Sequence, residues 1–296
     1  MRQVLRTTAA VGAVGGACVA YGSLVEVRSF RLRRVTSAVL PAGAQPVRVL
    51  HLSDIHLLPS QHKKQRWLAG LAALEPDLVV NTGDNLAHAD AVPYLIRSLG
   101  RLLDRPGVHV YGSNDYYEPK PKNPFVYFAR RRAPRAPDVQ LPWRELSEQF
   151  EARSWRAISH QRTEFEINGL RIELRGTDDA HLGLDDYAEV GGARADGVDL
   201  AIGVTHAPYL RILDAMAADD LDLLMAGHTH GGQVCVPGYG AVVTNCDLDT
   251  RRARGLSEHL GVPLHVSAGL GTSPYAPFRF ACPPEATLLT LVPRHR

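Results

Sequence analysis

The sequence has few cysteines, and their spacing excludes two classes of small stabilised domain. Its 296 residues include only Cys18, Cys235, Cys246 and Cys282, with no Cys-x-x-Cys pair. This spacing excludes a zinc ribbon and a disulfide framework. A Cys235–Cys246 disulfide would need an oxidising compartment, and buried free thiols are the favoured interpretation.

The sequence also lacks an excess of charge of either sign. Its 33 Lys and Arg and 31 Asp and Glu leave a net charge of +2, so the chain as a whole is not drawn to nucleic acid. It has no basic stripe with interleaved aromatic residues, and we therefore expect no nucleic-acid binding. A basic cluster within 130–135 could steer an anionic substrate or an acidic lipid head group, or could simply be a solvated loop.

The longest segment without charge lies near the start of the chain. Residues 7–25 are rich in Ala, Gly and Val, and arginines stand on both sides. This length just reaches that of a membrane-spanning helix, so we expect a single hydrophobic helix that anchors the protein in the cell membrane. A cleaved signal peptide and a buried helix of a soluble protein are the alternatives. The flanking arginines favour the cytoplasmic side only mildly, and the side of the membrane stays open.

Beyond residue 46 the apolar segments alternate between the lengths of strands and helices. We expect an anchor and linker over 1–45 and one domain over 46–296. Asn168-Gly169, between two alternating segments, predicts a β-hairpin. Strands are expected over 47–52, 78–81, 108–111, 200–205, 221–226, 264–267 and 286–292, and helices over 67–74, 91–103, 144–152 and 209–217. Such alternation is typical of an α/β domain that binds ligands at the carboxyl ends of its strands.

Metal-ligating residue types follow several of these strands directly. Carboxylate, imidazole and amide groups together suit Mn, Fe or Zn. In an extended segment residues i and i+2 face the same side, so Asp54 would point with His56, and His228 with His230. The full set is Asp54, His56, Asp84, Asn114, His206, His228 and His230. Seven ligands are too many for one tetrahedral ion and suit two divalent ions that share a carboxylate.

The order of these motifs resembles that of the calcineurin-like metallophosphoesterase superfamily. The resemblance is carried by Asp54-Ile55-His56, Gly83-Asp84-Asn85, Gly112-Ser113-Asn114-Asp115, His206 and Gly227-His228-Thr229-His230. Gly231-Gly232-Gln233, Gly269-Leu270-Gly271-Thr272, Arg279-Phe280 and Pro284-Glu285 resemble its bacterial membrane-associated YkuE/YaeI-like phosphodiesterase branch. The resemblance covers about residues 46–292 and implies two facing mixed β-sheets flanked by helices, a four-layer sandwich.

The resemblance also implies a role for each candidate residue. Asp54, His56 and His230 would hold one metal ion, Asn114, His206 and His228 would hold the other, and Asp84 would bridge the two. Asn85 would support the site from behind these ligands. A hydroxide bridging the two ions would attack the phosphate ester.

The third motif departs from the family pattern, which is usually Gly-Asn-His followed by Asp or Glu. Without a gap, Ser113 replaces the ligand Asn, and Asn114 replaces the His that helps to protonate the leaving group. With a shift of one residue, Asn114 stays a ligand and Asp115 takes the place of the His. We favour the shift because an amide oxygen is the better ligand. Asp115, the loop residue His181 or solvent would then protonate the leaving group, an effect worth roughly 10²–10⁴-fold.

These observations predict a dinuclear metal-dependent phosphoesterase, in the first place a phosphodiesterase. Its substrate would be a phosphate ester, either lipid-linked or nucleotide-linked. One alternative is a pyrophosphatase acting on a nucleotide-linked glycolipid. The other is a degenerate member that binds metal with little turnover, which only the altered third motif favours.

Overall fold

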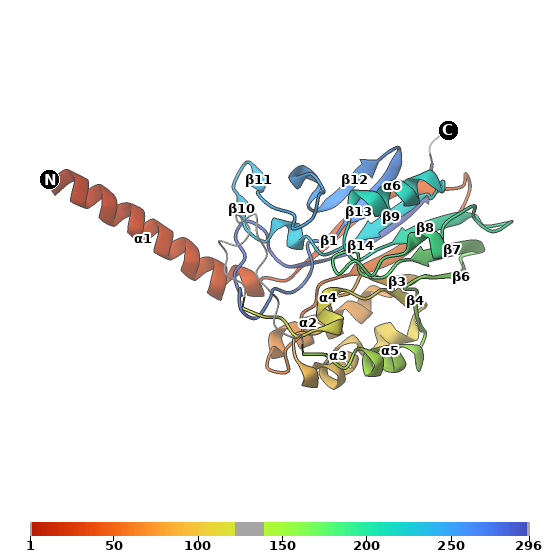
Figure 1. Ribbon diagram of the computed structural model, residues 1–296, viewed down its shortest axis with the longest axis horizontal. Helices are drawn as coiled ribbons and strands as arrows, with labels where there is room; N and C mark the ends of the chain where they lie inside the picture. The colour runs from red at the N-terminus through yellow and green to blue at the C-terminus, as the bar shows by residue number, and fades with distance from the viewer. Residues whose placement is uncertain (1, 122–138, 295–296) are drawn as a thin grey trace.

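The fold is described from a computed structural model, which covers residues 2–121 and 139–294, with side chains from residue 12 onward. Two six-stranded sheets face each other (Figure 1). The basic cluster within 130–135 lies outside the described residues. The four cysteines are free thiols, and Cys235 and Cys282 are buried.

The first sheet carries the motifs from the first half of the chain. In spatial order its strands are β1 (Arg31–Leu40), β14 (Glu285–Pro293), β2 (Val47–Leu52), β3 (Leu78–Asn81), β4 (Gly107–His109) and β5 (Trp155–Ala157). Strands β2 to β5 are parallel, so their carboxyl ends lie at one edge. Strand β14 runs antiparallel to β2 and parallel to β1.

The second sheet carries the motifs from the second half. In order its strands are β12 (Gly255–His259), β13 (Val262–Val266), β9 (Leu223–Ala226), β8 (Leu200–Val204), β7 (Leu170–Gly176) and β6 (Gln161–Ile167). Strands β7, β8, β9 and β13 are parallel, while β6 and β12 are antiparallel edges. A small separate ladder joins β10 (Cys235–Val236) and β11 (Gly240–Ala241).

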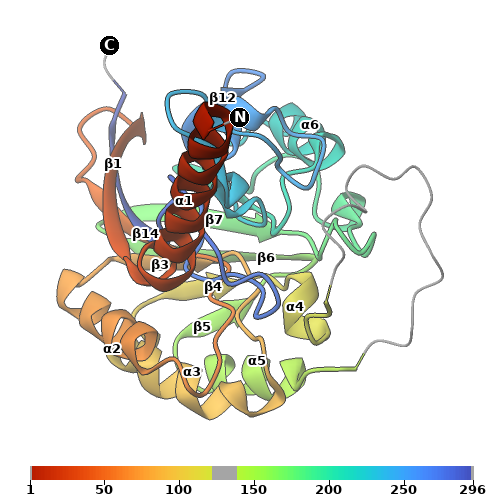
Figure 2. The ribbon, with the colours of Figure 1, turned by 90° about the vertical axis from the view of Figure 1, so that its left-hand side faces the viewer.

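Helices cover the outer face of each sheet, which makes four layers (Figures 1 and 2). The first sheet is covered by α2 (His62–Gly70), α3 (Val92–Leu99) and α5 (Trp143–Glu151), and the second by α6 (Leu210–Ala218). A one-turn helix, α4 (Ser113–Tyr116), follows β4. The mixed two-sheet architecture predicted from the sequence is therefore confirmed.

Strand β2 shows how the sequence divides between the layers. Val47 and Val49 belong to the apolar core between the sheets, whereas Leu50 and Leu52 pack under the helices. Successive side chains of a strand point to opposite faces, so His51, on the same face as Val49, lies between the sheets and is fully buried.

Part of the predicted linker belongs to the first sheet. Residues 31–40 form β1, which pairs in parallel with β14. The Arg33 guanidinium donates to the Glu285 carboxylate at 2.8 Å, and the buried Glu26 carboxylate accepts the backbone N–H groups of Ala281 and Cys282. These bonds join the segment before residue 46 to the end of the chain, so the folded region begins earlier than expected.

The apolar segment near the start forms α1 (Arg2–Leu24), which projects from the body of the molecule (Figure 1). Among the helices of the described residues, none combines the length and the hydropathy needed to cross a membrane. The predicted membrane-spanning helix over 7–25 is therefore not confirmed.

Candidate metal centre

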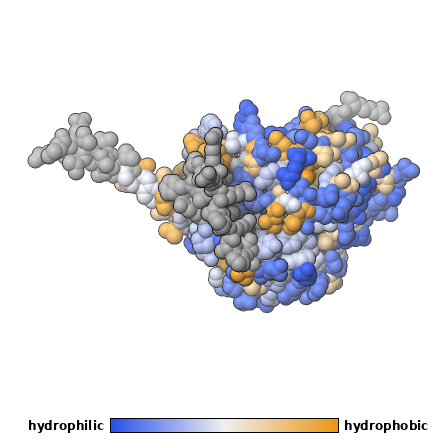
Figure 3. Space-filling view, in the orientation of Figure 1, coloured by the Kyte–Doolittle hydropathy of each residue, from blue (hydrophilic) through white to orange (hydrophobic). Residues whose placement is uncertain are grey.

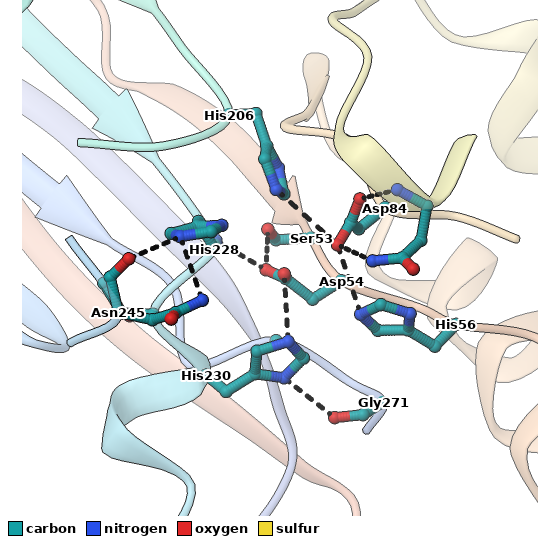
Figure 4. Close-up of polar contacts among 12 residues, drawn as sticks. Ser53, Asp54, His56, Asp84, His206, His228, His230, Asn245 and Gly271 are labelled. Carbon is teal, nitrogen blue, oxygen red and sulfur yellow. Dashed lines mark hydrogen bonds and ion pairs between the residues drawn. The ribbon is translucent and has the colours of Figure 1, made fainter. Parts of the chain in front are cut away.

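The carboxyl ends of four strands, two from each sheet, bring the candidate ligands together (Figure 4). Asp54 and His56 follow β2, and Asp84 follows β3. His206 follows β8, and His228 and His230 follow β9. Except for the half-buried His230, these side chains are at most 5% exposed. The site therefore lies where the two sheets meet, and neither sheet alone would complete it.

The backbone at five of these residues is left-handed rather than extended. The φ angles are +48° at Asp54, +42° at His56, +55° at Asp84, +67° at His228 and +50° at His230. Non-glycine residues rarely adopt this region, and they persist there only when the surrounding structure holds them. The reasoning that i and i+2 share a side in an extended segment therefore does not apply. His228 and His230 in fact face different neighbours.

Four of the candidate ligands form one compact group: Asp54, His56, Asp84 and His230 each offer a possible ligand atom within 4.8 Å of the others. His56 Nε2 lies 3.4 Å from Asp84 Oδ2, and His230 Nε2 lies 3.5 Å from Asp54 Oδ1. The imidazoles of His56 and His230 stack with their centres 5.1 Å apart. Two carboxylates and two imidazoles at this spacing can surround one divalent ion.

The remaining candidates lie on the other side of Asp84. His206 Nε2 is 3.6 Å from Asp84 Oδ2, and the rings of His206 and His228 meet edge-on at 5.2 Å. The Asn114 side-chain amide donates to Asp84 Oδ2 at 2.8 Å, and its backbone N–H donates to Asp84 Oδ1 at 2.7 Å. The structure thus brings Asn114, rather than Ser113, against the central carboxylate.

Backbone carbonyl oxygens fix the orientation of three imidazoles. The three bonds are His206 Nδ1 to Thr82 O at 2.7 Å, His228 Nε2 to Asn245 O at 3.3 Å, and His230 Nδ1 to Gly271 O at 3.1 Å. A ring nitrogen that donates to a carbonyl carries the proton, so in a neutral imidazole the other nitrogen keeps a free lone pair. This is the arrangement in which histidines bind metal ions.

Several buried ligand atoms have no hydrogen-bond partner within the described part of the chain. They are Asp54 Oδ1, His56 Nε2 and His206 Nε2. Leaving a buried acceptor unsatisfied costs roughly 1–3 kcal/mol, so three such atoms around one space require an explanation. Bound divalent cations would satisfy these atoms, and the mixed oxygen and nitrogen donors fit Mn, Fe or Zn.

Asp84 and His206 influence each other's charge at the centre. Burial lowers the pKa of His206, but the Asp84 and Asp179 carboxylates outweigh it and raise that pKa to about 9. Burial raises the pKa of Asp84, yet His206 and His56 outweigh it and lower that pKa. A cation and a carboxylate thus stabilise each other, and a metal ion would displace the imidazolium proton.

Asp115 lies behind Asp84 and accepts hydrogen bonds from the backbone. Its oxygens accept the N–H groups of Gly112 at 3.0 Å, Asp84 at 2.8 Å and Asn85 at 2.8 Å. Burial, reinforced by Asp84, raises its pKa to about 7. These contacts favour a role in holding the Asp84 loop. A role of Asp115 as proton donor stays a prediction.

Asn85 and His181 take different places around the centre. Asn85 is fully buried, and its side-chain Oδ1 accepts the side-chain amide of Asn81 at 2.7 Å, so Asn85 joins the loops behind Asp84. His181 is half-buried and its ring lies 4.6 Å from that of His228. Its Nδ1 is 3.1 Å from the Tyr209 hydroxyl. His181 is therefore at the edge of the site.

Sequence reasoning missed two buried cations beneath the ligands. Lys64 Nζ donates to the Ile55 carbonyl at 2.6 Å, and burial lowers its pKa to about 7. The Arg279 guanidinium donates to the carbonyls of Ala268 at 2.8 Å and Gly271 at 2.7 Å. Arg279 stood within a singled-out motif, but its function as a donor to these carbonyls gave no sequence signal. Lys64 lies on α2 among exposed polar residues, so nothing in the sequence indicated that it is buried.

Two facing mixed sheets with a cluster of Asp and His residues at their joined strand ends define a metal-binding α/β enzyme. The chain belongs to the calcineurin-like phosphoesterase family, whose sequence model matches residues 47–232. It is therefore a metal-dependent hydrolase of phosphoric esters.

Curated relatives resemble the chain over most of its length. It is 26% identical over 267 residues to the uncharacterized metallophosphoesterase YkuE of Bacillus subtilis, covering 87% of this chain and 83% of that protein. It is 26% identical over 298 residues to the phosphodiesterase YaeI of Escherichia coli, covering 98% of each. It is 25% identical over 210 residues to a bovine transmembrane protein with metallophosphoesterase domain, covering 70% of this chain and 45% of that protein.

Proposed function

We propose that this protein is a phosphodiesterase that works with two divalent metal ions. Asp54, His56 and His230 would hold the first ion, and Asn114, His206 and His228 the second. Asp84 would be shared, because its Oδ2 lies within 3.6 Å of ligand atoms from both sides. The observation that carries the proposal is this central position of Asp84 among buried lone pairs that have no partner in the described chain.

The residues around the centre hold it ready for substrate. Asn114 fixes both oxygens of Asp84, and a half-turn of its amide would present Oδ1 in place of Nδ2. Asp115 ties together the loops that follow β3 and β4. When bound, two divalent ions would polarise the phosphoryl group and lower the pKa of water toward neutrality.

Diester chemistry is favoured by the third motif and by the relatives. The family histidine that assists the leaving group is absent from Gly112-Ser113-Asn114-Asp115, and a similar protein is named a phosphodiesterase. Without a strong proton donor, the enzyme would cleave esters of acidic alcohols faster than esters of simple alcohols. The natural substrate, lipid-linked or nucleotide-linked, would carry a leaving group of this kind.

The experiment combines metal content with hydrolysis. The purified full chain, loaded with Mn²⁺, Fe²⁺ or Zn²⁺, is expected to hold two ions per chain and to hydrolyse bis(4-nitrophenyl) phosphate. Asp84→Asn should lose one ion and at least about 10³-fold in rate, because it removes the shared charge. The matched control is Asp90→Asn, since Asp90 is exposed.

The outcomes separate the alternatives. A wild-type protein that binds two ions and hydrolyses no ester supports the degenerate alternative. A nucleotide diphosphate sugar that is cleaved faster than the diester supports the pyrophosphatase alternative. A protein that binds none of the three metals refutes the proposal.

We also infer that α1 associates with a membrane surface. Residues 7–25 carry no charge, and Val14, Val19 and Leu24 are between 58% and 65% exposed on a helix that stands away from the body. Figure 3 shows apolar colour where this helix joins the body. A relative is named a transmembrane protein. Flotation of the full chain with phospholipid vesicles tests this, and Val19→Asp with Leu24→Asp should abolish flotation while leaving diester hydrolysis unchanged.

A further inference from the structure

A line of buried polar side chains connects the space between the two sheets to Asp54. His51 on β2 and His265 on β13 face each other across the sheets, with their Nδ1 atoms 2.9 Å apart. His51 Nε2 lies 3.0 Å from Thr82 Oγ1, and Thr82 Oγ1 lies 2.7 Å from Ser53 Oγ. Ser53 Oγ is hydrogen-bonded to Asp54 Oδ2. All five side chains are fully buried.

The direction of each hydrogen bond along this line of side chains follows from the carboxylate of Asp54 at its end. A carboxylate that binds metal is ionised and can only accept, so Ser53 donates its single hydroxyl proton to Asp54 Oδ2. The Ser53 oxygen then accepts from the Thr82 hydroxyl. The Thr82 oxygen, having spent its own proton, accepts from His51 Nε2.

The same reasoning assigns the tautomers of both histidines. A neutral His51 that carries its proton on Nε2 has a lone pair on Nδ1, so the proton between the two rings belongs to His265 Nδ1. His265 Nε2 is then unprotonated, and it has no partner among the described residues. Burial lowers the pKa of His51, and lowers that of His265 to about 3, which keeps both rings neutral.

We propose that His51, Thr82 and Ser53 are positioning residues that orient Asp54 for its metal ion. The inference rests on the proposed metal centre. The two hydrogen bonds that described residues donate to the Asp54 carboxylate both fall on Oδ2, one from Ser53 and one from the His228 backbone N–H at 3.0 Å. Oδ1 has no hydrogen-bond partner among the described residues and lies 3.5 Å from His230 Nε2, on the side of the other candidate ligands. These hydrogen bonds therefore orient the Asp54 carboxylate so that Oδ1, and not Oδ2, would face the ion.

Gly227, which precedes His228, makes room for this chain. A Cβ at this position would overlap Ser53 Oγ and would lie 2.7 Å from Asp54 Oδ2 and 2.9 Å from Thr82 Oγ1. Three members of the chain thus occupy the space of the missing side chain. Glycine is therefore required at position 227 to leave space for the hydrogen-bonded side chains behind the candidate ligands, and not only to form the turn.

The test compares two buried threonines in the full chain. Thr82→Val removes the hydroxyl within the chain. Thr287→Val removes a hydroxyl that has no partner in the described residues, from a fully buried residue directly opposite His51 on β14. Calorimetric titration of Mn²⁺ into metal-free protein is expected to show binding about 10-fold weaker for Thr82→Val, and unchanged for Thr287→Val.

A conservative variant and a spectroscopic readout separate positioning from packing. Thr82→Ser keeps the hydroxyl and should restore most of the Mn²⁺ affinity. Nitrogen-15 spectra of the Zn²⁺-loaded protein, in which Asp54 is ionised, should show His51 protonated on Nε2 and His265 on Nδ1. In Thr82→Val, His51 should lose this tautomer preference, because its acceptor is gone.

Two results would overturn the inference. One is equal Mn²⁺ affinity in Thr82→Val and Thr287→Val, and the other is a wild-type His51 protonated on Nδ1. If the wild-type protein binds Mn²⁺ and hydrolyses diesters while Thr82→Val matches it, only the positioning chain fails. If the wild-type protein binds no metal ion, the proposed function fails as well.

Discussion

One added methyl group at Gly227 probes the metal centre from behind its ligands. The Cβ of Gly227→Ala cannot coexist with the present position of Ser53 Oγ. Ser53 must rotate and give up its bond to Asp54, and a hydrogen bond to a charged group contributes roughly 1.5–3 kcal/mol. Residual crowding costs about 1–3 kcal/mol more. We therefore expect a loss of about 2.5–6 kcal/mol in the free energy of unfolding.

The assay is urea unfolding of metal-free protein followed by circular dichroism, together with Mn²⁺ titration. Gly70→Ala is the matched control, because a Cβ on this helical residue meets nothing within 4 Å. It should raise stability by up to about 1 kcal/mol and leave Mn²⁺ binding unchanged. Gly227→Ala should lower both quantities.

The double variant Ser53→Ala with Gly227→Ala separates crowding from hydrogen bonding. Removing Ser53 Oγ relieves the tightest of the three close contacts, so part of the stability should return, as expected for two residues in contact. Mn²⁺ affinity should stay low, because Asp54 still lacks its donor. If Gly227→Ala behaves like Gly70→Ala in both assays, the reasoning about this space is wrong.

Three further predictions follow from buried groups. The ring nitrogens of His109 have no hydrogen-bond partner among the described residues, and burial lowers its pKa to about 3. Below the ordinary histidine pKa of 6.5 only the unfolded chain binds this proton, so His109 by itself lowers the free energy of unfolding by about 2 kcal/mol from pH 7 to pH 5. His109→Leu should reduce the loss of stability over this pH range by that amount, and the exposed His62→Leu should not. Asp115→Asn places an amide donor against backbone donors, so the free energy of unfolding should fall by about 1–3 kcal/mol. The ratio of the rates on aryl and alkyl diesters should stay unchanged. A ratio that rises about 100-fold would instead identify Asp115 as the proton donor. Arg279→Met leaves the buried carbonyls of Ala268 and Gly271 without their donor. The free energy of unfolding, measured by thermal unfolding, should therefore fall by at least about 3 kcal/mol. An unchanged melting temperature would contradict this prediction.

Local pattern predicted the central strands closely. Strands β2 and β3 begin and end at the expected residues, 47–52 and 78–81. They are apolar runs buried on both faces, and such runs are bounded clearly by turn residues. The Asn168-Gly169 hairpin also lies where expected, between β6 and β7. Here the residues that decide the structure are neighbours in the chain.

Edge strands could not be predicted in the same way. Strand β1 contains Arg31, Arg33 and Arg34 and is largely exposed along its first half. Its partner β14 lies about 250 residues later in the chain, with Arg31 opposite Glu285. An edge strand needs no continuous apolar run. Whether such a segment forms a strand therefore depends on its pairing with a strand that is distant in the sequence.

The sequence predicted which residues belong to the candidate site, but not how their backbone and side chains are arranged. The ligand types and their order were visible, because each follows a strand. The left-handed backbone at Asp54, Asp84 and His228 was not, since none of these is glycine. Ser53, Thr82 and the Asn245 carbonyl also gave no signal, because serine, threonine and backbone groups occur everywhere and only the folded chain brings them to the ligands.

Buried hydrogen bonds at the centre stabilise the strained backbone of the candidate ligands. Five ligand residues with positive φ would each cost of order 1 kcal/mol or more, and such a loop persists only where other contacts hold it. Those contacts come from both sheets: Asp115 accepts the N–H groups of Asp84 and Asn85, and Asp54 accepts the N–H of His228. Since the loops are held by protein donors before any cation arrives, metal binding need not fold the site. It follows that chelation should weaken the protein without unfolding it, whereas changes at Asp115 or Gly227 should weaken it with or without metal.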